Sequence, residues 1–190
     1  MFDHFWKFTN QFVHFSAKEK EQIGAHLILR DVPKQHILVD FGDISREVYF
    51  INKGLLRFYY ISDDGREITG FVFHEGMMAG SHESFFGQQP SMQVLETIEA
   101  AELLVLPHDA LERLYQEVPK MNVFVRKLLE QRMSHAQKVV ASLIMQKPAD
   151  RYQEYQRLHP GLAGRIPQHM LATFMGITPV SLSRIRARKK

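Results

Sequence analysis

The sequence predicts an α+β chain with a β sandwich or barrel, then a long helix, and finally a small helical domain. Three observations predict this: short β-rich runs between turn residues over about 32–107, helical periodicity after Pro107, and helix-turn-helix spacing over 168–187. The 190 residues are 45% hydrophobic and 24% charged, a balance typical of globular proteins. The chain is therefore long enough for one large domain, or a medium domain plus a small one.

Composition excludes several kinds of site. The chain has no cysteine, so disulfides, thiolate zinc sites, iron–sulfur clusters and thiol nucleophiles are excluded. The first residues lack a basic region followed by an apolar one, and the longest charge-free run, 166–183, contains proline and glycine. We therefore expect no membrane partner and a cytoplasmic location.

The first 30 residues predict two short helices. Phenylalanines recur at spacings of three and four, at Phe5, Phe8, Phe12 and Phe15. Residues 16–19, Ser-Ala-Lys-Glu, have the pattern of a capping box, in which serine and glutamate satisfy free backbone N–H groups at a helix start.

Six β-rich runs follow, and residues with turn propensity separate them. The runs are 36–41, 48–51, 55–61, 68–73, 92–98 and 103–106. The turns are 42–43, 52–54, 63–65 and 74–76, each with a glycine. Short strands at close spacing favour an antiparallel sandwich or barrel.

After Pro107 the chain returns to helical periodicity, first over 109–118 and then from Pro119 to about Met145. A helix of about 27 residues spans roughly 40 Å, which is longer than a domain of this size usually needs. Apolar residues at spacings of three and four form a seam suited to a homodimer; the alternative is that this seam packs on its own sheet. The seam residues are Val125, Leu129, Met133, Ala136, Val140 and Leu143.

Charge is unevenly distributed along the chain. Residues 149–190 hold eight basic and two acidic residues, a net charge of +6, which leaves −3 for the first 148 residues. Such a segment suits a polyanion such as nucleic acid, although a solvated terminus would have the same composition.

The segment from Gln168 has the spacing of a helix-turn-helix. Ala172 is fifth, Gly176 ninth, Leu182 fifteenth and Ile185 eighteenth. Ala172 is small, as the crossing of the two helices requires, and Gly176 permits the positive φ that ends the first helix. Leu182 and Ile185 bury one face of the second helix.

The second of these helices predicts a DNA-reading surface. Thr178 is a suitable N-cap and Pro179 a suitable first-turn residue. Arg184 can make a bidentate contact to guanine. The alternative is a plain helix pair with a charged tail. The expected DNA contacts are Thr178, Pro179, Val180, Ser181, Ser183, Arg184, Arg186 and Arg188.

This order of segments resembles the Crp/Fnr family of bacterial transcription regulators. Residues 76–86 lie where that family has its Gly-x-x-x-Gly-Glu phosphate-binding cassette, and 171–185 match its DNA-reading motif. The resemblance implies a cyclic-nucleotide-binding-like β jelly roll as sensor domain (1–118), a dimerisation helix (119–146) and a helix-turn-helix domain (147–190). It also implies double-stranded promoter DNA, a second copy of the chain and RNA polymerase as partners.

The cassette departs from the family pattern. The family's glutamate and arginine, which hold the ribose hydroxyl and the cyclic phosphate, correspond here to Ser81 and Ser91. A buried phosphate would lack a positive partner, so we expect no cyclic AMP binding by the usual contacts. The pocket either takes an unidentified small-molecule effector or is filled by His82, Phe85 and Phe86. Its residues would be Gly76, Gly80, Ser81, His82, Ser91 and Met92.

The sequence ends five residues beyond Ile185, so we expect a helix-turn-helix without a β-hairpin wing. His74, Glu75, His82 and Glu83 lack the His-x-His spacing of cupin metal sites, so we expect no metal. Catalytic motifs are absent, and we predict no enzyme activity and no cofactor. The predicted function is a homodimeric regulator on a two-fold operator; the alternative is a small-molecule- or partner-binding jelly-roll module with a helical tail that does not bind DNA.

Overall fold

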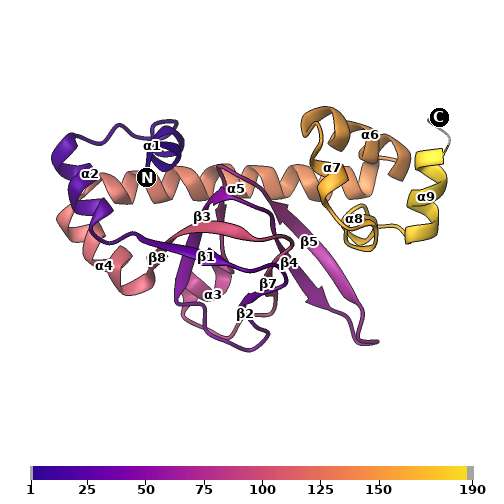
Figure 1. Ribbon diagram of the computed structural model, residues 1–190, viewed down its shortest axis with the longest axis horizontal. Coiled ribbons are helices and arrows are strands. Elements are labelled where there is room, and N and C mark those ends of the chain that lie inside the picture. Colours follow the sequence, from indigo (N-terminus) through magenta and orange to yellow (C-terminus); the bar gives the residue numbers. More distant parts are fainter. Residues whose placement is uncertain (1, 188–190) are drawn as a thin grey trace. The chain divides into compact units, whose positions relative to one another are not determined.

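The computed structural model describes residues 2–187, which form two compact units (Figure 1). The first unit contains residues 2–58 and 72–131, and the second contains 59–71 and 132–187. The division falls within the long helix, after Gln131, whereas the sequence suggested boundaries at its two ends. None of the helices within 2–187 is both long and apolar enough to cross a membrane.

The first unit begins with the two expected helices, α1 (Asp3–Thr9) and α2 (Ala17–Gly24). The capping box of α2 is confirmed, since the Glu19 N–H donates to Ser16 Oγ and the Ser16 N–H donates to the Glu19 carboxylate. The phenylalanine pattern also has its structural reason. Phe8 packs on Phe50 and Phe124, with ring centroids 5.3 and 6.1 Å apart, and so joins the N-terminal helix to a strand and to the long helix.

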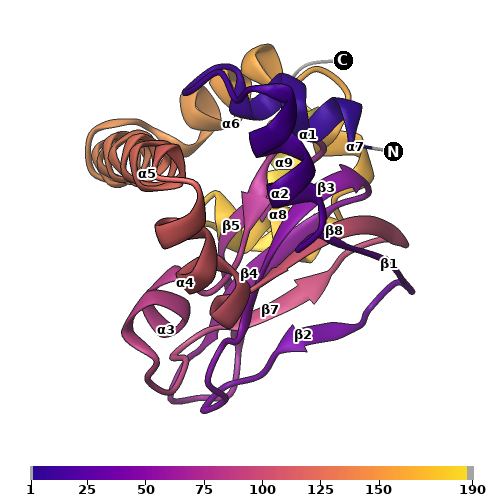
Figure 2. The same ribbon diagram turned by 90° about the vertical axis from the view of Figure 1, so that its left-hand side faces the viewer.

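Two four-stranded antiparallel sheets confirm the β sandwich (Figure 2). Their strand orders are β1-β8-β3-β6 and β2-β7-β4-β5. The strands are β1 (Ile28–Val32), β2 (Ile37–Val39), β3 (Glu47–Lys53), β4 (Leu56–Ile61), β5 (Glu67–Phe73), β6 (Met78–Ala79), β7 (Val94–Thr97) and β8 (Ala101–Pro107). The predicted turn glycines 42, 54, 65 and 76 all have positive φ.

Three elements of the first unit were not predicted. Strand β1 lies within the first 32 residues, where the sequence indicated helix, and it pairs with β8 so that Ile28 lies opposite Val105. Strand β6 is only two residues long, and α3 (His82–Gly87) is a helix of six. The two predicted helices after the sandwich are confirmed as α4 (His108–Glu117) and α5 (Lys120–Met145).

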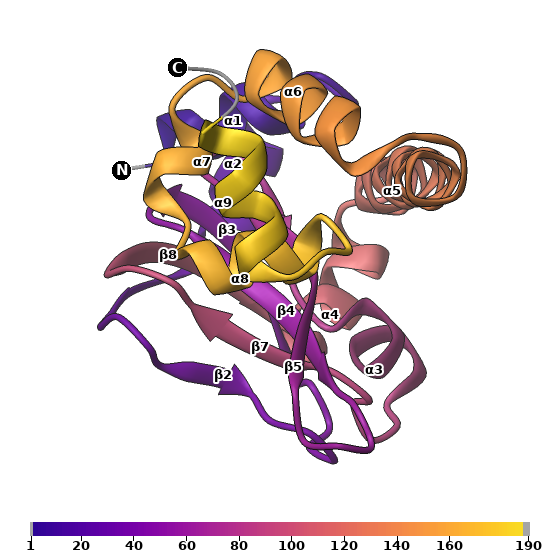
Figure 3. The same cartoon turned by 90° about the vertical axis from the view of Figure 1, so that its right-hand side faces the viewer.

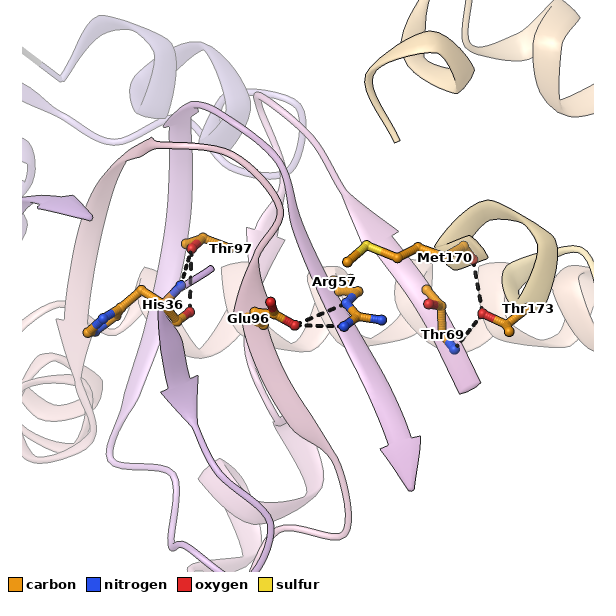
Figure 4. Close-up of polar contacts among 7 residues, drawn as sticks. All are labelled: His36, Arg57, Thr69, Glu96, Thr97, Met170 and Thr173. Atoms are coloured by element: carbon orange, nitrogen blue, oxygen red, sulfur yellow. Dashed lines mark hydrogen bonds and ion pairs between the residues drawn. The ribbon is translucent and has the colours of Figure 1, made fainter. Parts of the chain in front are cut away.

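The second unit contains the four C-terminal helices, shown in Figure 3. They are α6 (Pro148–Leu158), α7 (Leu162–Arg165), α8 (Gln168–Phe174) and α9 (Pro179–Ala187). Phe174 is the centre of an aromatic cluster, with its ring centroid 6.2 Å from Phe71 and 5.5 Å from Tyr155. The Thr69 N–H donates to Thr173 Oγ1 over 3.2 Å (Figure 4). Because α8 and α9 follow each other closely and pack together, they form the predicted helix-turn-helix.

Candidate nucleic-acid interface and effector cassette

Local chemistry fixes the start of α9. The Ser181 N–H donates to Thr178 Oγ1 over 3.2 Å, so Thr178 caps the helix as predicted, and Pro179 is its first residue. Gly176 has a φ of 67°, the positive value expected for the residue that ends the preceding helix. The Thr178 cap and the positive φ of Gly176 together set the direction in which the chain enters α9.

The inner and outer faces of α9 are clearly distinct. Leu182 is fully buried and Ile185 half-buried, while Ala172 is fully buried in α8, which packs against α9. The structural roles predicted for these positions are therefore confirmed. Ser181 is half-buried, and its hydroxyl lies 3.0 Å from Thr178 Oγ1. The exposed residues among the expected DNA contacts are Thr178, Pro179, Val180, Ser183 and Arg184.

The two arginines of α9 have different surroundings. Arg184 is exposed, and within residues 2–187 its side chain makes no hydrogen bond or ion pair. Arg186 is half-buried: its Nε donates to the Tyr152 hydroxyl over 3.0 Å, and its Nη2 donates to the Ala163 carbonyl over 3.2 Å. Arg184 is thus available to an external ligand, whereas Arg186 ties α9 to α6 and α7. Arg188 lies outside the described residues.

The apolar seam of α5 divides into two parts. Val125 is only 8% exposed and belongs to the core of the first unit, and Leu129 packs partly against that core. This part of the seam therefore packs within its own chain, which was the alternative to a homodimer contact. Met133 and Val140 are 66% and 54% exposed, and Ala136 and Leu143 are exposed as well. Ile144 and Met145, which were not predicted, extend this exposed stripe.

The cassette serines bond to each other. Ser81 Oγ and Ser91 Oγ are 2.8 Å apart, and Gln93 Nε2 donates to Ser81 Oγ over 3.3 Å. Ser91 Oγ also donates to the Gln93 carbonyl over 2.7 Å. Both serines are almost fully buried, and Gln93 Oε1 is buried without a hydrogen-bond partner. These polar groups are therefore largely satisfied within the chain.

The other expected cassette residues do not converge on one point. Met92 is mostly exposed, and His82 is half-buried with its ring stacked on Phe86 at 6.4 Å. Phe85 is fully buried in the core of the first unit. Of the two glycines, Gly76 has positive φ, whereas a Cβ on Gly80 would lie 3.0 Å from Val48 Cγ1.

Comparisons with known proteins cover both the sandwich and the C-terminal helices. The family model of the cyclic nucleotide-binding domain matches residues 29–118. The regulatory protein HlyX of Actinobacillus pleuropneumoniae is 25% identical over 179 residues, which cover 84% of this chain and 70% of HlyX. A solved structure described as a crp/fnr-family transcriptional regulator, from Eubacterium rectale, has a TM-score of 0.71 at 18% identity and covers 92% of this chain and 83% of its own. In sequence and in fold, the chain is therefore similar to regulators of the Crp/Fnr family.

A further solved structure with a similar fold is the c-di-GMP responsive global regulator CLP of Xanthomonas campestris. Its TM-score is 0.73 at 20% identity, and the match covers 92% of this chain and 91% of CLP. The chain also matches two curated anaerobic regulatory proteins and spans 65% and 62% of their lengths. All these relatives have the names of regulators rather than of enzymes.

Arg151, which the sequence pattern did not single out, joins α5, α6 and α8 within the second unit. Its Nη1 donates to the Ser142 and Gln146 carbonyls over 3.1 and 3.0 Å, at the end of α5. Its Nη2 donates to the Met175 carbonyl over 2.6 Å, at the end of α8. Burial lowers the pKa of Arg151, but a guanidinium remains charged at neutral pH.

Replacing Arg151 by methionine is expected to lower the free energy of unfolding by about 2–3 kcal/mol, because three partly buried carbonyls lose a charged donor. Urea unfolding followed by circular dichroism measures the change. Arg157→Met is the matched control, since Arg157 is exposed on the same helix. Equal effects of the two substitutions would show that Arg151 does not hold the helix ends together.

A buried ion pair in the sandwich was also missed. Arg57 on β4 donates from Nε and Nη2 to Glu96 Oε2 on β7, over 3.2 and 2.7 Å (Figure 4). Both residues are less than a tenth exposed. Neither position departs from the β pattern in a way that reveals its partner, since the pair forms only when β4 and β7 lie in the same sheet.

Arg57→Met is expected to destabilise the protein by about 3–5 kcal/mol, because it leaves the Glu96 carboxylate buried without its positive partner. The double variant Arg57→Met/Glu96→Leu removes both charges and should recover most of that loss. Thermal unfolding of the two variants and the wild type gives the comparison. A double variant as unstable as Arg57→Met would mean that side-chain packing, and not the unpaired charge, accounts for the loss.

Proposed function

We propose that this DNA-binding Crp/Fnr-family regulator acts as a homodimer on a two-fold operator, with α9 of each protomer in the major groove of one half-site. The observation that carries the proposal is the exposed Arg184, which has no partner among the described residues and lies on the outer face of a capped helix. Recognition helices of helix-turn-helix proteins present their outer face to base edges in this way.

Two further features support the proposal. The exposed apolar stripe from Met133 to Met145 offers a surface for a second copy of the chain. Residues 149–190 have a net charge of +6, which favours binding to the DNA backbone. RNA polymerase as a partner and a cytoplasmic location stay predictions.

Selection of random duplex DNA by the purified full chain tests this function. We expect enrichment of a palindrome whose half-sites are about one helical turn apart. Enrichment of no sequence at moderate salt would contradict the proposal and favour the alternative, a ligand- or partner-binding module with a structural helical tail.

The sensor domain, we further propose, does not bind cyclic nucleotides by the contacts usual in the family. The positions that would hold the ribose hydroxyl and the phosphate are the mutually bonded Ser81 and Ser91, which supply no positive charge. Calorimetric titration with cyclic AMP, cyclic GMP and cyclic di-GMP should give only heats of dilution. A saturable isotherm that Ser91→Ala abolishes would show instead that these serines hold a nucleotide.

A further inference from the structure

We propose that Val180 reads the C5 methyl group of a thymine, within about two base pairs of the guanine that Arg184 contacts. The inference rests on the proposed function, because it assumes that α9 lies in the major groove. Beyond the guanine contact of Arg184, the operator would then contain a thymine that the protein selects by an apolar contact.

The position of Val180 on α9 is the first observation. Val180, Ser183, Arg184 and Ala187 follow the i, i+3, i+4, i+7 pattern and so share one face of the helix. All four are exposed, whereas Leu182, which points to the opposite side, is fully buried. Val180 thus lies on the outer face, in the first turn, where recognition helices contact base edges.

The second observation is the exposure of this apolar side chain. Val180 is 60% exposed, and in the described parts of α8 and α9 it is the one large apolar residue classed as exposed. Pro179, Ser183 and Arg184 are also exposed on α9, and of these only Pro179 is apolar, so the apolar surface around Val180 is limited to two small side chains and is too small for a protein partner. A valine in these surroundings fits a small apolar target.

Base chemistry identifies that target. Valine has no side-chain donor or acceptor and cannot read the hydrogen-bonding edge of a base. The C5 methyl of thymine is the apolar group that a base pair presents in the major groove, and apolar side chains recognise thymine through it. The guanidinium of Arg184 suits the O6 and N7 acceptors of guanine on the same face.

Helix geometry limits the distance between the two bases. Val180 and Arg184 are four residues apart, which corresponds to about 6 Å along the helix axis at about 1.5 Å per residue. Base pairs are about 3.4 Å apart along a strand, so the thymine and the guanine lie about two base pairs apart or closer.

The test uses the operator obtained by selection and replaces this thymine by deoxyuridine, which lacks only the methyl group. For the wild-type full chain, we expect roughly fourfold weaker binding when one half-site is changed, the value for burial of one methyl-sized group. For Val180→Ala, thymine and deoxyuridine should bind alike. Deoxyuridine at a thymine outside both half-sites is the control, and circular dichroism confirms that the variant is folded.

A wild-type chain that binds no operator contradicts the proposed function itself. Operator binding without a deoxyuridine effect overturns only the role of Val180. A Val180→Ala chain that is weaker on all sequences yet keeps the full thymine preference also overturns it, since Val180 would then act through packing.

Discussion

Arg184→Ala is expected to lower the affinity for the selected operator by roughly 5- to 150-fold, which corresponds to about 1–3 kcal/mol for one bidentate contact to guanine. The side chain is exposed and has no partner among residues 2–187, so its removal should leave the fold intact. Fluorescence anisotropy with labelled duplex measures the loss. The variant should also lose discrimination at one base pair of each half-site.

Arg157→Ala provides the matched control for Arg184→Ala. It removes the same charge from an exposed position on α6. We expect a small loss of affinity that is the same for every DNA sequence. If Arg184→Ala behaved in the same way, with sequence preference unchanged, Arg184 would contact phosphate rather than a base.

Val140→Glu is expected to convert the proposed homodimer to a 22.2 kDa monomer. The stripe that contains Val140 would place two glutamates, one from each protomer, in an apolar contact, and each buried unpaired carboxylate costs several kcal/mol. We expect the dimer dissociation constant to rise by about a thousandfold or more. Sedimentation equilibrium measures the mass, and operator affinity should fall with it.

Lys138→Glu, an exposed change on the same helix but outside the seam, should leave the dimer intact. A wild-type chain that sediments as a monomer at micromolar concentration would refute the homodimer directly. A dimer that survives Val140→Glu would place the contact elsewhere.

Local sequence signals predicted the parts of the fold that local chemistry determines. The capping box at Ser16, the cap at Thr178 and the positive φ of Gly176 each depend on a few neighbouring residues, and all three are present. Long helical periodicity likewise predicted α4 and α5. At these positions propensity and tertiary structure agree.

The features that were missed depend on distant partners. Strand β1 exists because β8, more than 70 residues later, pairs with it, and its own residues alternate too weakly to indicate a strand. The contacts of Arg151 and Arg57 require carbonyls and a carboxylate that only folding brings near. Arg186 was expected to contact DNA, because nothing in its sequence surroundings reveals its hydrogen bond to Tyr152.

The internal bonds of Arg151 and Arg186 bear on how ionic strength should act on the protein. Eight cations lie in residues 149–190, but these two already have oxygen partners inside the domain. Counterions are released from DNA only by cations that reach its phosphates. The affinity of the complex should therefore respond to added salt less steeply than the number of basic residues suggests.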